Sequence, residues 1–134
     1  MKTVSYHQID ALESDYLHVE VSQLINAGNG LYTAIDIYKD ERIAVFHGKK
    51  LTSNQSEKLS GQGLDQYFMM LPDNRILDCR TVACFAKYAN DAAVHPSGFK
   101  NNAKIAFDDE NKVSLIALRK IKSGEEIFCS YGKP

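Results

Sequence analysis

The residues that could carry chemistry fall into four short segments. Residues 28–32 read GNGLY, and their two glycines let the backbone approach a ligand without a Cβ in the way. Residues 67–68 are an aromatic pair that opens a strand-like stretch. Residues 87–92 read KYANDA and contain Asn90, whose amide can both donate and accept hydrogen bonds. Residues 124–132 read GEEIFCSYG and place Tyr131 beside a glycine near the end of the chain.

Each segment, taken alone, also has a plain structural interpretation. The GNG sequence lacks the third glycine and the following helix of a dinucleotide-binding fingerprint, and such a pair of glycines is typical of a β-turn. Aromatic residues favour strands and fill cores, Asn-Asp is a common turn signal, and a tyrosine on a terminal strand is usually a core residue. No single segment therefore decides the function.

The composition limits the classes of protein to consider. A chain of 134 residues with 44% hydrophobic residues can bury one core without disulfides or metals. The 16 Lys and Arg nearly balance the 17 Asp and Glu, so we expect no direct nucleic-acid binding. The sequence contains neither a long apolar run nor a secretory signal, and we therefore expect a soluble, intracellular protein that does not enter the membrane.

Metal chemistry is not expected from the cysteine and histidine pattern. Cys79, Cys84 and Cys129 are odd in number and lack CxxC spacing, and the 4 histidines are scattered. We predict that the cysteines are reduced core residues, without a disulfide framework or a metal site.

The hydrophobic pattern predicts a mostly β domain. Residues 16–23 alternate, with Leu17, Val19 and Val21 on one side, as in a half-buried strand. The polar stretch 52–66 is either a surface insertion with one weak helix or a long loop, and residues 80–89 have the spacing of a short buried helix or turn. Further strands are predicted at 30–34, 43–46, 67–71, 75–78, 104–107, 113–118 and 127–131.

Together and in this order, the four segments resemble the SET family of protein lysine methyltransferases. The resemblance runs from about Leu17 to Gly132 and includes residues 36–52, DIYKDERIAVFHGKKLT. Residues 78–80 and 87–92 are similar to the family motif R-F-x-N-H-S, and GEEIFCSYG is similar to G-E-E-L-x-[YF]-x-Y-G. The resemblance implies one SET domain at 17–134 after an amino-terminal segment 1–16. It also implies a fold of several small sheets with a knot-like carboxyl-terminal core and one or two short helices.

The resemblance also implies an activity. The chain would transfer methyl groups from S-adenosylmethionine, leaving S-adenosylhomocysteine, to an accessible lysine of a protein or peptide, most commonly a histone, and no metal would be needed. The family pattern brings Asn90 and Tyr131 together across the knot. The implied catalytic residues are Tyr131 and Tyr67, the implied cofactor-binding residues are Gly28, Asn29, Gly30, Tyr32, Tyr88, Asn90 and Asp91, and the implied substrate-channel residues are Phe128 and Cys129.

Several positions depart from the family pattern. Asp91 and Ala92 stand where the family has His and Ser, and the small Cys129 suggests room for two or three methyl groups. The family often has a cysteine-rich segment here that completes the lysine channel, and this sequence has none. We therefore expect the channel to be covered by the first sixteen residues, by a second subunit of a homodimer, or by the substrate. Two alternatives stay open. A catalytically weak or inactive SET/PR-like peptide-binding module would bind little cofactor, whereas an unrelated small β protein would hold Asn90 and Tyr131 far apart.

Overall fold

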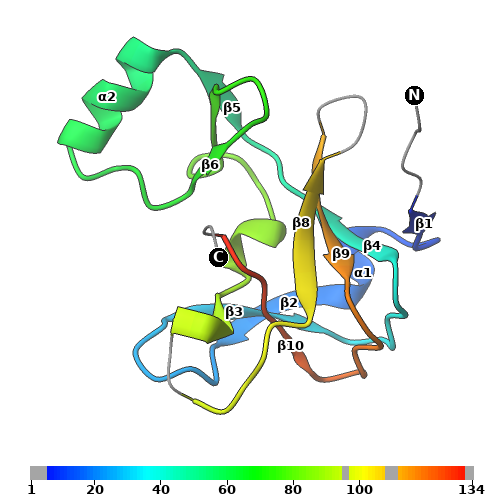
Figure 1. Ribbon diagram of the computed structural model, residues 1–134. Coiled ribbons are helices and arrows are strands. Elements are labelled where there is room, and N and C mark those ends of the chain that lie inside the picture. Colours follow the sequence, from blue (N-terminus) through cyan, green and yellow to red (C-terminus); the bar gives the residue numbers. More distant parts are fainter. Residues whose placement is uncertain (1–5, 95–96, 108–111, 132–134) are drawn as a thin grey trace.

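The computed structural model describes residues 6–94, 97–107 and 112–131. These residues form the predicted mostly β fold, built from three small sheets (Figure 1). The strands are β1 (His7–Gln8), β2 (Leu17–Val21), β3 (Asn29–Thr33), β4 (Glu41–Val45), β5 (Lys49–Leu51), β6 (Phe68–Met70), β7 (Ile76–Asp78), β8 (Ala103–Phe107), β9 (Val113–Ala117) and β10 (Glu126–Ile127). The helices are α1 (Glu13–Tyr16), α2 (Ser53–Gly61) and the 3₁₀ turns η1 (Ala86–Tyr88) and η2 (Ala92–Val94).

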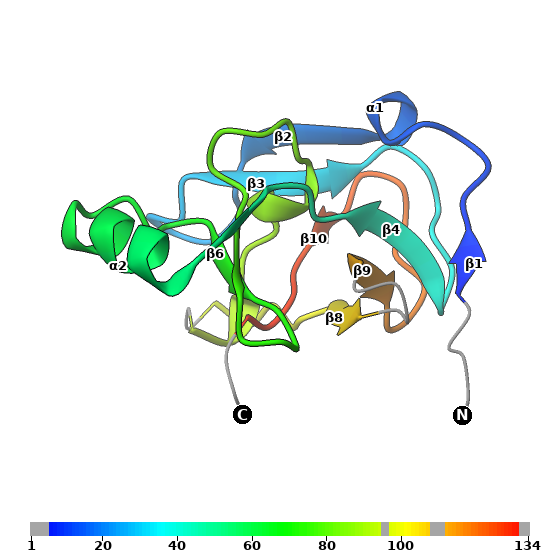
Figure 2. The same ribbon diagram turned by 90° about the horizontal axis from the view of Figure 1, so that it is seen from above.

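The sheets have the strand orders β1-β4-β9-β8, β10-β3-β2 and β5-β7-β6. Figure 2 shows the sheet that carries α2 on one side of the molecule and the four-stranded sheet on the other, with β10 between them. Side chains from all three sheets meet in one buried cluster that includes Leu31, Ile43, Leu77 and Ile127. The described residues therefore form one main core surrounded by short strands.

The predicted strand at 16–23 is confirmed as β2, but one detail of its pattern is wrong. Leu17 is buried as expected, whereas the side chain of Val21 is 77% exposed. Strand β2 is the outer strand of its sheet and pairs only with β3. Val21 lies at the far end of this pairing, opposite Asn29, where no further element covers it.

The polar stretch 52–66 contains the predicted weak helix, α2. Thr52 and Gln55 form a capping box, in which the Thr52 hydroxyl oxygen accepts from the Gln55 N–H at 3.2 Å and the Gln55 side chain accepts from the Thr52 N–H at 2.9 Å. None of the residues of α2 is buried. The helix is thus held by its cap and its connections to β5 and β6 rather than by an apolar face.

The carboxyl-terminal strand is shorter than predicted. Regular pairing ends at Ile127, because the next two residues each pair with a single residue of another segment. Phe128 forms a parallel bridge with Asn90, and Cys129 forms one with Ala103. This segment therefore runs between two parts of the chain that are distant in sequence.

Candidate functional site

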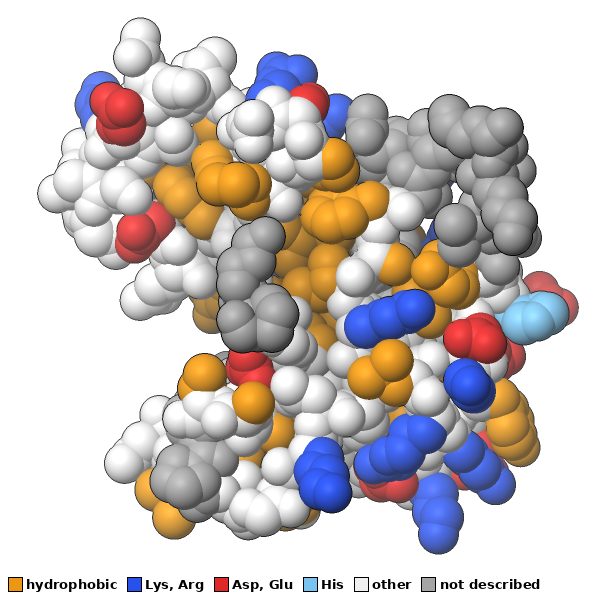
Figure 3. Space-filling view, in the orientation of Figure 1, with side chains coloured by type: hydrophobic (Ala, Val, Ile, Leu, Met, Phe, Trp, Pro, Cys, Tyr) orange, Lys and Arg blue, Asp and Glu red, His pale blue; other side chains and the backbone are white. Residues whose placement is uncertain are grey.

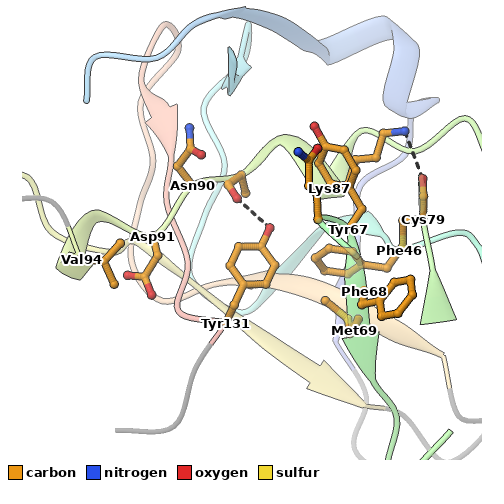
Figure 4. A pocket seen from close by; sticks show the side chains of 12 residues that line it. Phe46, Tyr67, Phe68, Met69, Cys79, Lys87, Asn90, Asp91, Val94 and Tyr131 are labelled. Carbon is orange, nitrogen blue, oxygen red and sulfur yellow. Dashed lines mark hydrogen bonds between the residues drawn. The ribbon is translucent and has the colours of Figure 1, made fainter. Parts of the chain in front are cut away.

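A pocket of about 370 Å³ opens where these distant segments meet (Figure 4). Its size falls within the range of small-molecule sites in proteins, roughly 300 to 1,000 Å³. Its lining residues are Phe46, Gln66, Tyr67, Phe68, Met69, Cys79, Lys87, Ala89, Asn90, Asp91, Val94 and Tyr131. Most of these residues are aromatic or apolar, and amide and charged side chains stand among them.

The hydroxyl group of Tyr131 is fixed at the base of the pocket. It donates a 2.6 Å hydrogen bond to the carbonyl oxygen of Ala89, and the carbonyl oxygen of Ala86 lies 3.4 Å away. The Tyr131 ring packs edge-to-face against Phe46, with 6.3 Å between ring centroids. Burial of the hydroxyl raises the pKa of Tyr131 well above its usual value, so the phenol stays neutral at physiological pH.

Asn90 connects three of the four sequence segments. Its side-chain Nδ2 donates to the carbonyl oxygen of Asn29 at 2.9 Å, and its own carbonyl oxygen accepts from the Cys129 N–H at 2.9 Å. Asn90 and Tyr131 also line the same pocket. The expectation of the unrelated-protein alternative, that these two residues lie far apart, is therefore wrong.

Lys87 holds one wall of the pocket together. Its Nζ donates to the carbonyl oxygen of Cys79 at 3.1 Å and to that of Arg80 at 3.3 Å. The same Nζ lies 5.3 Å from the ring centroid of Tyr67 and 5.4 Å from that of Tyr88, within cation–π range. Because these two rings also contact each other edge-to-face, Tyr67 has a rigid support behind it.

The turn before β3 is shaped by the buried carboxylate of Glu126, whose side chain is 2% exposed. Glu126 accepts from the Ser22 hydroxyl at 2.6 Å and from the Gln23 N–H at 2.7 Å. A Cβ on Gly30 would overlap this carboxylate, which explains the glycine at that position. Gly28 has φ +73°, a left-handed conformation that glycine adopts without strain.

Tyr32 lies on β3, next to this turn. Its hydroxyl donates to the carbonyl oxygen of Val21 at 2.7 Å and contacts Glu126 Oε1 at 3.2 Å. Its burial, together with the negative charge of Glu126, raises the pKa of Tyr32 to about 12. Tyr32 thus stabilises the turn through its hydroxyl and is not among the residues that line the pocket.

The structure brings only some of the predicted site residues together. Four of them line the pocket: Tyr67, Asn90, Asp91 and Tyr131. Tyr88 packs behind Tyr67, and the predicted residues 28–30 and Tyr32 belong to the adjoining turn and strand, joined to the pocket by the bond from Asn90 to Asn29. The predicted helix or turn at 80–89 is only the 3₁₀ turn η1, which begins at Ala86.

The two predicted channel residues do not line the pocket. Phe128 is buried and packs against Phe99, with 5.5 Å between ring centroids, in a small separate cluster with Leu24 and Ala92. Cys129 is fully buried. In extended chain, successive side chains point to opposite faces, so Phe128 points away from the face that Tyr131 shares with Cys129.

Several lining residues were not singled out from the sequence. Phe46 ends an apolar run and has no local feature that separates it from a core residue. Lys87 stands within the KYANDA segment, immediately before Tyr88, and a cation next to an aromatic pair is a signal that could have pointed to it. Glu126 does not line the pocket but shapes the adjoining turn, and in the GEE sequence it could have been recognised as a charged residue placed beside the apolar Ile127 and Phe128.

Asp91 has a defined structural role at the position where the family pattern has histidine. Its Oδ1 accepts from the Ala93 N–H at 2.9 Å and from the Asn101 Nδ2 at 3.0 Å. Asn101 Oδ1 in turn accepts from the Ala92 N–H at 2.8 Å. The substituted motif is thus fixed by its own hydrogen bonds, and Asp91 still presents part of its side chain to the pocket.

A second hollow adjoins the pocket and shares Phe68, Met69 and Tyr131 with it. It has a volume of about 560 Å³ and lies between β6 and β8, each of which is the last strand of its sheet. Figure 3 shows hydrophobic side chains gathered on this face between the part that carries α2 and β8. The lining residues are otherwise Met70, Leu71, Pro72, Asn74, Ile105, Phe107 and Ser130.

The described part of the amino-terminal segment packs against β4. Strand β1 pairs in parallel with β4, and the Tyr16 hydroxyl donates to the carbonyl oxygen of Ile43 at 2.7 Å. Glu13 accepts from the Val45 N–H at 3.0 Å. None of residues 6–16 lines either hollow.

Within the described parts of the chain, no group of three or more His, Cys, Asp or Glu side chains is arranged to hold a metal ion. No helix among the same residues has the length and apolar character that a membrane crossing requires.

Comparison with known proteins agrees with the geometry. Residues 28–132 match the SET domain family. The chain is 24% identical over 135 residues to the histone-lysine N-methyltransferase trithorax of Drosophila virilis, covering 98% of this chain and 3% of that protein. It is also 24% identical over 109 residues to the histone-lysine N-methyltransferase mes-2 of Caenorhabditis elegans, covering 78% of this chain and 14% of that protein. The chain thus spans a small part of the relatives it matches, and it belongs to the SET domain family.

Proposed function

We propose that this chain is a protein-lysine N-methyltransferase that uses S-adenosylmethionine and acts on a protein or peptide, with histones as the first substrates to test. The observation that carries the proposal is the convergence of Asn90 and Tyr131 on one pocket from separate segments. Family membership and the two relatives, both histone-lysine N-methyltransferases, support the same activity.

The pocket and the adjoining turn fit the chemical groups of the cofactor. The turn at residues 28–30 offers backbone groups, with Gly28 free of any atom within 4 Å of where a Cβ would stand. Asn90 and Asp91 offer an amide and a carboxylate for the polar amino-acid end. The aromatic wall suits a positively charged sulfur through its π faces. When bound, the cofactor supplies a methyl group on that sulfur.

Tyr131 would orient the amine of the substrate lysine. Because its proton is donated to the Ala89 carbonyl oxygen, the lone pairs of the hydroxyl oxygen are available to accept a hydrogen bond from the amine. An unperturbed lysine must lose a proton at a cost of about 4.5 kcal/mol at pH 7 before it can attack. Methyl transfer is an in-line displacement, in which the neutral amine attacks the methyl carbon and the sulfur leaves. A desolvated site that aligns the amine supplies the positioning that this displacement requires.

The groove between β6 and β8 would hold the substrate backbone. In the described structure β6 has no further strand on its outer edge, and β8 has none beyond Ala103, which bridges Cys129. An extended peptide can add to such an edge by main-chain hydrogen bonds. The groove meets the pocket at Tyr131, so a lysine at the middle of the peptide could extend toward the hydroxyl. In this arrangement the substrate itself covers the channel.

The test combines titration calorimetry with S-adenosylmethionine and a radiolabelled transfer assay on histones, for the parent and for Tyr131→Phe. We expect both proteins to bind the cofactor and only the parent to transfer methyl groups. Tyr38→Phe is the matched control, because Tyr38 is exposed and lines neither hollow, and it should behave as the parent. Absence of cofactor binding by the parent would instead identify a catalytically inactive, peptide-binding SET module.

A further inference from the structure

A third hollow lies between α2 and the strands β5 and β7. It has a volume of about 410 Å³, within the size range of ligand sites. Figure 1 shows α2, β5 and β6 together in one part of the molecule. The hollow shares no lining residue with the pocket or with the second hollow, so it is a separate feature of the fold.

Positive side chains dominate the charged part of its wall. Lys49 of β5, Lys58 of α2 and Arg80, which follows β7, all line it. Asp78 is the one acidic residue among the described lining residues, and it is only 2% exposed. These four residues define what we call the basic hollow, whose wall carries three positive charges and one negative charge.

The three cations are not neutralised by ion pairs within the part of the chain that the structure describes. None of Lys49, Lys58 and Arg80 forms an ion pair there, whereas Arg119 on the surface pairs with Glu125 at 3.2 Å. The positive charge of the basic hollow is therefore available to a negatively charged group from outside the chain.

Arg80 is the most firmly placed of the three cations. Its backbone N–H donates to Asp78 Oδ1 at 3.0 Å, and its carbonyl oxygen accepts from Lys87 Nζ at 3.3 Å. Its guanidinium Nε, by contrast, is buried without a hydrogen-bond partner. A buried donor without a partner is rare in folded proteins, because it has lost its bonds to water and gained none. The backbone of Arg80 is thus fixed while its charged group lacks a partner in the described structure.

An acidic peptide segment fits this hollow better than a nucleic acid does. Guanidinium and ammonium groups donate charge-assisted hydrogen bonds to carboxylates. Leu51 and Leu59 also line the hollow and offer apolar contacts to an aliphatic side chain beside the carboxylate. Nucleic acids bind instead to a basic stripe that follows many phosphates, and the net charge of this chain is -1.

We propose that the basic hollow is a binding site for an acidic peptide segment of a partner protein. An aspartate or glutamate side chain of the partner pairs with Arg80 and the two lysines, and a neighbouring aliphatic side chain contacts Leu51 and Leu59. The inference does not depend on methyl transfer, because the basic hollow is separate from the pocket. Residues 78–80 contribute to both, so the bound partner would lie beside the site of the proposed reaction.

The experiment measures the binding of two fluorescein-labelled peptides to the full chain by fluorescence anisotropy. The acidic peptide has the sequence GSDLEDLSG, and its neutral control has the sequence GSNLQNLSG. We expect the acidic peptide to bind about tenfold more tightly or better, because it adds charge-assisted bonds, and its affinity should fall as the salt concentration rises. Equal affinities for the two peptides would overturn the proposal.

Variants locate the peptide on the chain. Arg80→Gln should weaken binding of the acidic peptide by about tenfold and Lys58→Gln by about threefold, since a partly buried cation contributes more than an exposed one. Lys39→Gln is the matched control, because Lys39 is exposed and lines none of the three hollows, and the same loss of charge there should leave the affinity unaltered.

Two further outcomes would contradict the proposal. Parent-like affinity in Lys58→Gln and in Arg80→Gln would place the peptide elsewhere, and circular dichroism shows that each variant is folded. Because Lys58 is exposed on α2, its variant tests the site even where Arg80→Gln does not fold. Tighter binding of a DNA duplex than of the acidic peptide, weakened by the same two variants, would identify a nucleic-acid site instead.

Discussion

Tyr131 donates a 2.6 Å hydrogen bond from its hydroxyl to the carbonyl oxygen of Ala89, a residue 42 positions earlier in the chain. Ala89 immediately precedes Asn90, so the same bond that orients the tyrosine also fixes the segment that reaches the first turn. The short segment of Ala89 and Asn90 therefore positions two groups of the proposed site. These are the Tyr131 hydroxyl, which would be catalytic, and the Asn90 amide, which would hold the cofactor.

Replacing Tyr131 by phenylalanine should lower stability only modestly while it removes methyl transfer. The variant loses one hydrogen bond and leaves the Ala89 carbonyl oxygen without this partner, at a cost of about 1 kcal/mol in the free energy of unfolding. The transfer rate should fall by about 100-fold or more, as expected when a positioned catalytic group is removed. Urea unfolding and transfer rates measure the two effects, and a stability loss of several kcal/mol would mean that the tyrosine is chiefly structural.

Asn90→Ala should weaken cofactor binding and loosen the first turn. The variant loses the 2.9 Å bond from Nδ2 to the Asn29 carbonyl oxygen, which is the side-chain link between the pocket and residues 28–30. We expect a cost of about 1 kcal/mol in unfolding free energy and at least a tenfold loss of affinity for S-adenosylmethionine, since a tenfold change corresponds to about 1.4 kcal/mol.

Asn54→Ala provides the control for this prediction. Asn54 is exposed on α2 and lines neither hollow. The same chemical change there should leave the affinity for S-adenosylmethionine unaltered. Equal affinity of Asn90→Ala and the parent, measured by calorimetry, would show that Asn90 does not contact the cofactor.

Local patterns predicted the strands far better than they predicted the site. The alternating residues 16–23 predicted a strand, and β2 forms there, although burial falls along the strand from Leu17 to the exposed Val21 rather than alternating. The meeting of Asn90 with residues 128–131 depends on tertiary packing, and only the resemblance to a family anticipated it. The resemblance implied that Phe128 is a channel residue, whereas its side chain packs with Leu24 and Ala92 in a separate cluster, and a motif position does not state which face of the chain a side chain occupies.

Gly30→Ala should be one of the most damaging small substitutions in the chain. The added methyl group would overlap the buried Glu126 carboxylate, which is held by Ser22 and Gln23 and cannot move without breaking those bonds. We expect a loss of about 2 kcal/mol or more in unfolding free energy, typical of overpacking. Gly61→Ala, at the end of α2 with no atom within 4 Å of the new methyl group, should be neutral or slightly stabilising. Similar urea midpoints for the two variants would contradict this account of the turn.

The buried tyrosine Tyr16 should make the protein sensitive to alkaline pH. Burial and the nearby carboxylate of Glu13 raise the pKa of Tyr16 from 10.0 to about 12 in the folded state. The unfolded chain therefore releases this proton first, and the contribution to stability is complete below pH 10 and is lost as the pH rises toward 12. Tyr16→Phe should flatten the fall of unfolding free energy over that window, although it also removes the bond to Ile43 and so lowers stability at neutral pH. Urea titrations at a series of alkaline pH values measure the slope, with Tyr38→Phe as the exposed control that should keep the parent slope. A parent-like slope in Tyr16→Phe would show that this phenol does not govern alkaline unfolding.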